Sequence, residues 1–169
     1  MRFRIVPEQS AVLIEASSSL HPIRTRTTGL EGFLDVDVRD GAVVPSATPR
    51  GELSLRVDRL SSGNILEDRE LQRRIDAQRY PTITGRMEHM TKADGDGRFT
   101  VVGDLTFRGV TRQCEDDLVI TPVDDHTLRV EGESTFDIRD FGMEPPRILM
   151  LRVHPDVKVR IELVAEKDR

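Results

Sequence analysis

The chain has 169 residues, of which 37% are hydrophobic and 33% charged, and it contains no tryptophan. This length suits one domain, which we place at residues 1–169, with enough chain to bury roughly 70% of the surface that the unfolded form would expose. The net charge of −5 and the lack of a long Lys/Arg run argue against nucleic acid as a partner, because a negative protein repels a phosphate backbone.

Alternation of apolar and polar residues, the pattern of a half-buried strand, dominates the chain. It is clearest where Leu128, Val130 and Phe136 share one face and charged residues occupy the other. Eight strands with one apolar face each favour a closed antiparallel β-barrel whose interior holds one ligand, and a β-sandwich would show the same pattern. The predicted strands, in chain order, are residues 11–18, 29–38, 51–58, 82–90, 99–107, 110–120, 127–138 and 157–163.

One stretch between the third and fourth predicted strands has the periodicity of a helix. Residues 65–77 are rich in helix formers, and Ser62 or Asn64 is the expected N-cap. Leu71 and Ile75 lie four residues apart on one face, while the remaining face is charged. We therefore predict a short amphipathic helix that lies across a sheet or a barrel mouth.

The fifth and sixth predicted strands are joined by a two-residue loop, Arg108–Gly109. Glycine supplies the positive φ that the favoured two-residue turns need. Counting outward from this loop places Phe107 opposite Val110 on the inner face, and Arg112 and Asp116 on the same face. A β-bulge in the second strand would reverse this assignment. The hairpin is thus predicted to build a wall, with two charged residues that point into the lumen or lie near its rim.

The N-terminal segment and the cysteine count bear on the compartment. Charged and polar residues interrupt the apolar ones throughout the first 16 residues, so we expect no secretory signal. No stretch of about 18 apolar residues occurs, which argues against integral membrane association. Cys114 is the single cysteine, which excludes an intrachain disulfide and fits a reducing compartment. We expect a cytoplasmic protein.

Four segments, in this order, resemble the YceI-like family of polyisoprenoid-binding domains: "YPTITGR" (80–86), "FTVVGDLTFRGVTRQ" (99–113), "FDIRDFGM" (136–143) and "VHPDVKVRIELVAE" (153–166). The Ser-rich turn and helix of residues 60–71 also resemble the family, so the likeness covers nearly the whole chain. It implies an all-β fold, a single lipocalin-like barrel of eight antiparallel strands with one short helix between strands. It also implies an interior that binds a long isoprenoid or similar apolar chain, with a polar head near the mouth.

Three features depart from the family pattern. Gly85 stands where the family commonly has an aromatic residue, and Phe141 stands where it often has tryptophan. Residues 73–81 also lack the phenylalanine that the family usually has between the helix and the Tyr-Pro. Fewer or smaller aromatic rings would widen the cavity or change its shape.

The resemblance makes the inward apolar side chains of the strands the expected ligand wall. To these it adds Phe141, and also His21, which lies in an early loop where relatives often carry a histidine that could touch a head group. The alternative is that the same side chains simply fill the interior as a packed core. The expected ligand-binding residues are Val12, Ile14, Leu53, Leu55, Val57, Val101, Leu105, Phe107, Leu128, Val130, Phe136, Phe141, Val157, Val159, Ile161 and His21.

The function implied is the binding, carriage or sequestration of a hydrophobic isoprenoid-like or lipid molecule, without catalysis. Two alternatives stay open: an enzyme acting on a small apolar substrate in the same cavity, for which Arg112 and Asp116 are the polar candidates, and a ligand-free structural or interaction module. We expect no catalytic residue, metal or cofactor, because the four histidines show no zinc-like spacing and no phosphate-binding loop occurs. The expected partner is a hydrophobic small molecule; an exposed strand edge or the charged helix could mediate a homodimer.

Overall fold

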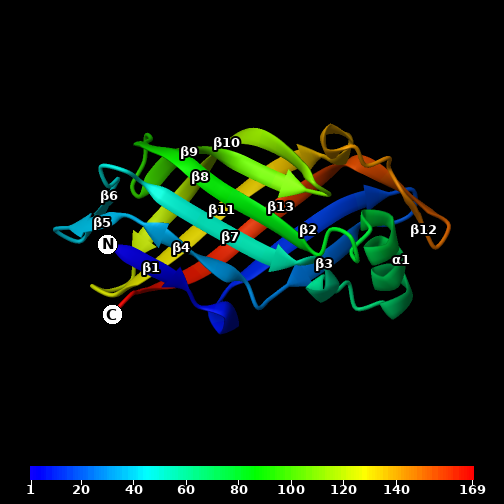
Figure 1. The fold of residues 1–169 in the computed structure, drawn as a ribbon, viewed down its shortest axis with the longest axis horizontal. Coiled ribbons are helices and arrows are strands. Elements are labelled where there is room, and N and C mark those ends of the chain that lie inside the picture. The colour runs from blue at the N-terminus through cyan, green and yellow to red at the C-terminus, as the bar shows by residue number, and fades with distance from the viewer.

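The computed structural model describes residues 1–169 (Figure 1). It contains thirteen strands, one α-helix and three short 3-10 helices. In chain order these are β1 (Arg2–Ile5), η1 (Pro7–Gln9), β2 (Ala11–Ser18), β3 (Ile23–Thr27), β4 (Glu31–Asp35), β5 (Asp37–Arg39), β6 (Ala42–Val44), β7 (Arg50–Arg56), η2 (Val57–Arg59), α1 (Ile65–Ile75), β8 (Thr82–Lys92), β9 (Arg98–Phe107), β10 (Val110–Pro122), β11 (Thr127–Asp137), η3 (Ile138–Phe141), β12 (Arg147–Ile148) and β13 (Leu151–Lys167).

The strands close into an antiparallel barrel with eight strand positions. β4, β7, β8, β9, β10, β11 and β13 follow one another around it, and β1 closes it by pairing with both β4 and β13. β2 and β3 continue β1 and β4 along the same two positions, because β2 also pairs with β13 and β3 pairs with β2. The predicted eight-stranded barrel is confirmed, and the sandwich alternative is wrong.

Two strands near the start of the chain, β1 and β3, lie outside the predicted segments. In β3, Ile23, Thr25 and Thr27 are buried and the two arginines between them are exposed. Two of the three inward residues are threonines, so the hydrophobic alternation is too weak to reveal a strand. The predicted strand at residues 29–38 divides, because β4 joins the barrel whereas β5 pairs with β6 in a separate two-stranded sheet.

The barrel interior is packed most extensively at one end. The end that carries both chain termini, here called the terminal end (left in Figure 1), is filled by a cluster of 14 buried residues. In this cluster Phe3, Phe99, Ile120 and Leu128 are at most 1% exposed. α1 and β12 lie at the opposite end, here called the helix end (right in Figure 1), together with two smaller clusters of four buried residues each.

α1 forms where the sequence predicts it and ends two residues earlier. Its N-cap is Asn64, whose side chain accepts hydrogen bonds from the backbone N–H groups of Leu66 (3.0 Å) and Glu67 (3.2 Å). These bonds satisfy donors that the first turn of a helix leaves free. Leu71 and Ile75 face the barrel as predicted, which turns the helix into a cover for the helix end.

The β9–β10 hairpin has the predicted register, with Phe107 opposite Val110, and no bulge interrupts it. The loop residues Arg108 and Gly109 have φ angles of 52° and 73°, as a two-residue turn between twisted strands requires. A Cβ atom at Gly109 would lie 2.8 Å from the ring of Tyr80. Glycine therefore serves both the turn and the close packing of the tyrosine that follows α1.

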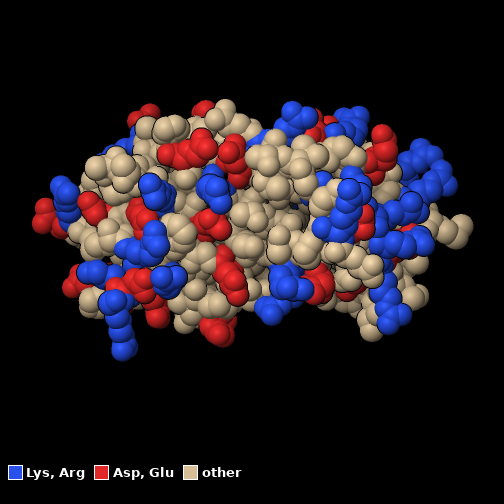
Figure 2. Space-filling model, in the orientation of Figure 1, with Lys and Arg blue, Asp and Glu red and all other residues tan.

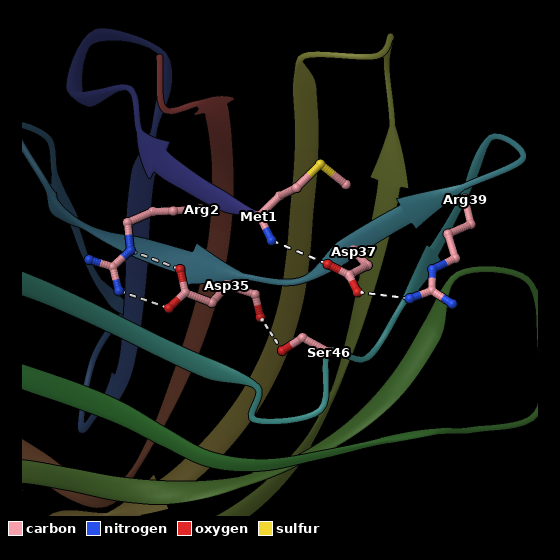
Figure 3. A network of polar contacts seen from close by, with 6 residues as sticks. All are labelled: Met1, Arg2, Asp35, Asp37, Arg39 and Ser46. Atoms are coloured by element: carbon pink, nitrogen blue, oxygen red, sulfur yellow. Dashed lines mark hydrogen bonds and ion pairs between the residues drawn. The ribbon is translucent and has the colours of Figure 1, made fainter.

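A network of polar contacts ties β1 to β4 and β5 at the terminal end (Figure 3). The Arg2 guanidinium donates two hydrogen bonds of 2.8 Å to the Asp35 carboxylate. The amino group of Met1 lies 3.2 Å from the Asp37 carboxylate, and Ser46 Oγ donates to the main-chain oxygen of Asp35 over 3.4 Å. These contacts fix the strand that closes the barrel.

Replacing Asp35 by asparagine is expected to destabilise the protein at neutral pH more than at acid pH. The hydrogen bonds from Arg2 hold the pKa of Asp35 below its usual range. The stability that Asp35 contributes is therefore present above the ordinary carboxyl pKa of about 4 and is lost as the pH falls through the lower pKa of the folded state. Urea unfolding of the native protein and of Asp35→Asn should give midpoints that differ at pH 7 and converge towards pH 3.

Glu162→Gln is the matched control, because Glu162 forms an exposed ion pair with Arg160 (3.1 Å) and such pairs contribute little. A gap between the native protein and Asp35→Asn that stays constant from neutral to acid pH would contradict this account of the network.

Candidate ligand-binding site

A cavity of about 310 Å³ occupies the helix end of the barrel. Of its 33 lining residues, 22 are hydrophobic, and its volume lies at the lower end of the range of small-molecule sites. Val12 and Leu55 belong both to the lining and to the packed cluster, so the cavity begins where that cluster ends. The barrel thus combines a filled half with a hollow half.

Eleven of the sixteen side chains expected to contact a ligand line this cavity. They project from the inner faces of β2, β7, β9, β11 and β13, and one comes from η3. These eleven are Val12, Ile14, Leu53, Leu55, Leu105, Phe107, Phe136, Phe141, Val157, Val159 and Ile161.

The structure places the other five elsewhere. Val101, Leu128 and Val130 belong to the packed cluster of the terminal end or pack against it. Val57 is fully buried in η2, beyond the end of β7. His21 is exposed in the turn between β2 and β3, with its Nδ1 3.0 Å from the main-chain oxygen of the next residue. Alternation predicts the face on which a side chain lies and not its depth along the barrel, which accounts for the first three.

The helix end also supplies lining residues that the list above lacks. Leu71 and Ile75 come from α1, and Met143, Pro146 and Ile148 come from the segment that leads from η3 to β13. The four-residue spacing in the helix was a usable signal for the first two. The other three lie outside any long periodic element, so alternation gave no signal for them.

Gly85 of β8 leaves space in the cavity wall. It pairs with Leu53 on one side and with Leu105 on the other, and all three residues line the cavity. A Cβ atom built at Gly85 would meet no atom within 4 Å. The lack of a side chain at this position therefore coincides with open volume in the cavity wall.

Two arginines fasten the β9–β10 hairpin to the segment around η3. Arg108 Nη1 donates to the main-chain oxygen of Gly142, and Arg112 Nε donates to that of Asp140, both over 2.8 Å. Arg112 pairs with a lining residue of β9 but does not itself line the cavity. Its charge therefore lies at the rim and not in the lumen.

Asp116 is the inward charged side chain that β10 does bring to the cavity wall. Ser134 Oγ donates a 2.6 Å hydrogen bond to its carboxylate. Burial raises the pKa of Asp116; the Ser134 hydrogen bond opposes this effect, and Asp117 and Glu115 reinforce it. Burial, together with nearby carboxylates, also raises the pKa of the Cys114 thiol, which disfavours the thiolate that a cysteine nucleophile needs.

The charges outside and inside the helix end differ in sign. Figure 2 shows that Lys and Arg predominate on the surface around α1, whereas both signs are mixed over the terminal end. α1 itself contributes Arg69, Arg73 and Arg74, of which Arg73 and Arg74 form ion pairs with Glu70 of the same helix (2.7 and 3.2 Å). No Lys, Arg or His lines the cavity.

The structure forms no cluster of three or more His, Cys, Asp or Glu side chains suited to a metal ion. Its single α-helix has 11 residues, and no helix has the length and hydrophobicity that crossing a membrane would require.

Comparison with known proteins identifies the architecture. The family model of the YceI-like domain matches residues 3–165. Among curated proteins, no sequence matches the chain.

Solved structures with the same fold are distant in sequence. BcnA of Burkholderia cenocepacia is 15% identical with a TM-score of 0.79, and the alignment covers 95% of this chain and 98% of that one. A polyisoprenoid binding domain of Saccharophagus degradans, implicated in plant cell wall breakdown, is 14% identical with a TM-score of 0.80 and 98% coverage of both chains. The YceI protein of Campylobacter jejuni is 17% identical with a TM-score of 0.63 and 82% coverage of both.

Proposed function

The chain belongs to the YceI-like family, and on this premise we propose that it binds one hydrophobic molecule, an isoprenoid or a similar lipid chain, in the cavity at the helix end. The observation that carries the proposal is the hollow half of the barrel, with its largely apolar lining. A related domain is described as polyisoprenoid binding, which supports an isoprenoid as the first ligand class to test.

The proposed mechanism is burial of an apolar chain without reaction. Each buried CH₂ group contributes about 0.8 kcal/mol, so a chain that fills the lumen binds through many small, non-directional contacts. The rigid strands hold the wall in place, while α1 and the segment before β13 cover its end. Such a site suits carriage or sequestration of the ligand.

A series of isoprenoid alcohols tests this proposal. Geraniol, farnesol and geranylgeraniol share a hydroxyl head and differ in chain length, and each is titrated against a fluorescent apolar probe bound to the protein. We expect farnesol to bind at least about tenfold more tightly than geraniol, because additional CH₂ groups are buried. We expect the gain in affinity to level off once the isoprenoid tail is longer than the cavity. Failure of all three alcohols to displace the probe would contradict the proposal.

A further inference from the structure

β10 and β11 separate at the level of the cavity. They pair over only five residue pairs, whereas β10 pairs with β9 over ten and β11 pairs with β13 over eleven. The first part of β10 and the last part of β11 therefore lack pairing with each other. Asp117 and Glu133, which are exposed on the outer side of these strands, both reach the cavity lining. The cavity is thus accessible from the side, at a place we call the β10–β11 opening.

All charged side chains in the lining are acidic, namely Glu67, Asp68, Asp116, Asp117 and Glu133. The two on α1 lie in its first turn, where the helix dipole stabilises an acid. On the outer side of the opening, Asp117 lies 3.8 Å from Arg98 and Glu133 lies 3.7 Å from Lys158. Four of the five acids are thus stabilised locally, two by the helix dipole and two by a basic side chain nearby.

Asp116 lacks such compensation. It is half buried inside the β10–β11 opening and forms no ion pair, and its hydrogen bond from Ser134 uses one acceptor position. A carboxylate has about four such positions. Burial makes a charged group costly unless it is paired and hydrogen-bonded, and this half-buried carboxylate has acceptor positions that a donor on a ligand can occupy.

A second polar group is buried in the cavity wall without a partner. Thr25 lines the cavity and is 6% exposed, and its Oγ1 is buried without a hydrogen bond. A row of paired residues links the two sites along the wall, because Ser134 pairs with Val159, Val159 with Ile14, and Ile14 with Thr25. Four strand steps in an eight-stranded barrel place Thr25 on the wall opposite Asp116.

We propose that the cavity takes an amphiphile whose polar head is a protonated amine, with the ammonium group bound by Asp116 at the β10–β11 opening and the apolar tail extending into the cavity towards α1. This inference rests on the proposed function, because it names the head group of the hydrophobic ligand proposed there. The opening keeps the charged head near water while the tail is buried.

Charge decides between the possible head groups. An ammonium has several N–H donors and offsets the charge of Asp116, and hydrogen bonds between ionised partners are about twice as strong as neutral ones. A hydroxyl can donate to Asp116 but leaves its charge uncompensated. A carboxylate or phosphate head would face acids on the lining with no cation among them.

Three ligands with the same tail test the proposal: dodecylamine, dodecanol and dodecanoate, each used at neutral pH to displace the fluorescent probe. We expect dodecylamine to bind about tenfold more tightly than dodecanol, because both head groups can donate to the Asp116 carboxylate but only the ammonium offsets its charge. Dodecanoate should bind most weakly. In Asp116→Asn the amine and the alcohol should bind within about twofold of each other.

Glu115→Gln is the matched control, because it removes the same charge from the adjacent residue of β10, which is exposed and does not line the cavity. It should keep the preference for the amine. Ser134→Ala supplies a second test that leaves the carboxylate in place: the preference should persist or increase, because the internal donor is removed.

Equal affinities for the three ligands in the native protein would overturn the proposal, as would loss of the preference in Ser134→Ala. Tightest binding of dodecanoate would also overturn it and would show that the basic outer surface selects the head group. These results differ from failure of the proposed function, in which neither dodecanol nor farnesol displaces the probe.

Discussion

Replacing Gly85 by phenylalanine is expected to abolish binding of apolar chains while preserving the fold. The new ring would enter the cavity between Leu53 and Leu105, where a Cβ atom meets nothing within 4 Å. Filling a cavity without forcing strain commonly preserves or increases stability. We therefore expect farnesol affinity to fall by at least about a hundredfold, or roughly 2.7 kcal/mol, with an unfolding midpoint equal to or above that of the native protein.

Two further variants make this result interpretable. Gly85→Ala adds only a methyl group and should weaken binding slightly. Arg86→Phe adds the same ring on the neighbouring residue, whose side chain is exposed and pairs with Glu52 on the outer surface (3.6 Å), and it should leave binding intact. Retention of farnesol affinity in a folded Gly85→Phe protein would place the ligand outside this cavity.

Truncating Phe99 to alanine should produce a large loss of stability. Phe99 is 1% exposed and lies in the packed cluster of the terminal end. Phenylalanine-to-alanine changes in packed cores cost about 3–5 kcal/mol, because both the burial and the packing of the ring are lost. Urea unfolding should reveal a decrease in the free energy of unfolding within that range.

Phe136→Ala is the matched comparison, since it removes the same ring from the hollow half. Phe136 lines the cavity, is half buried and belongs to none of the three packed clusters. We expect a loss of about 1–2 kcal/mol, because its ring faces open volume on one side. Similar losses for the two variants would contradict the division of the barrel into a packed and a hollow half.

The inner faces of the strands follow from local pattern, whereas the depth of a side chain along the barrel does not. Alternation and the two-residue loop correctly predict the β9–β10 register, down to Phe107 opposite Val110. The same alternation treats Leu128 and Phe136 alike, although one is fully buried at the terminal end and the other lines the cavity. Which end is filled depends on the whole cross-section, including β1, whose residue Phe3 fills the terminal end and which lies outside the predicted strands.

For the polar side chains of the site, too, the sequence predicts the face of the strand but not the final position. The register predicts that Arg112 and Asp116 of β10 share the inner face, which the pairing with β9 confirms. The positions of the two side chains depend on neighbours distant in sequence. Arg112 lies at the rim because it donates a hydrogen bond to a main-chain oxygen of η3. Asp116 lies in an opening because β11 separates from β10. Neither feature has a periodic signal in the sequence.

The most direct test of the central claim, that the hollow half of the barrel holds an apolar chain, is a pair of two-dimensional amide NMR spectra recorded with and without farnesol. We expect shifts for residues around the cavity, with Gly85 and Gly132 as isolated reporters on β8 and β11, and none for Phe3, Phe99 or Ile120 in the packed cluster. Unchanged spectra at saturating farnesol, or shifts confined to the terminal end, would contradict the claim.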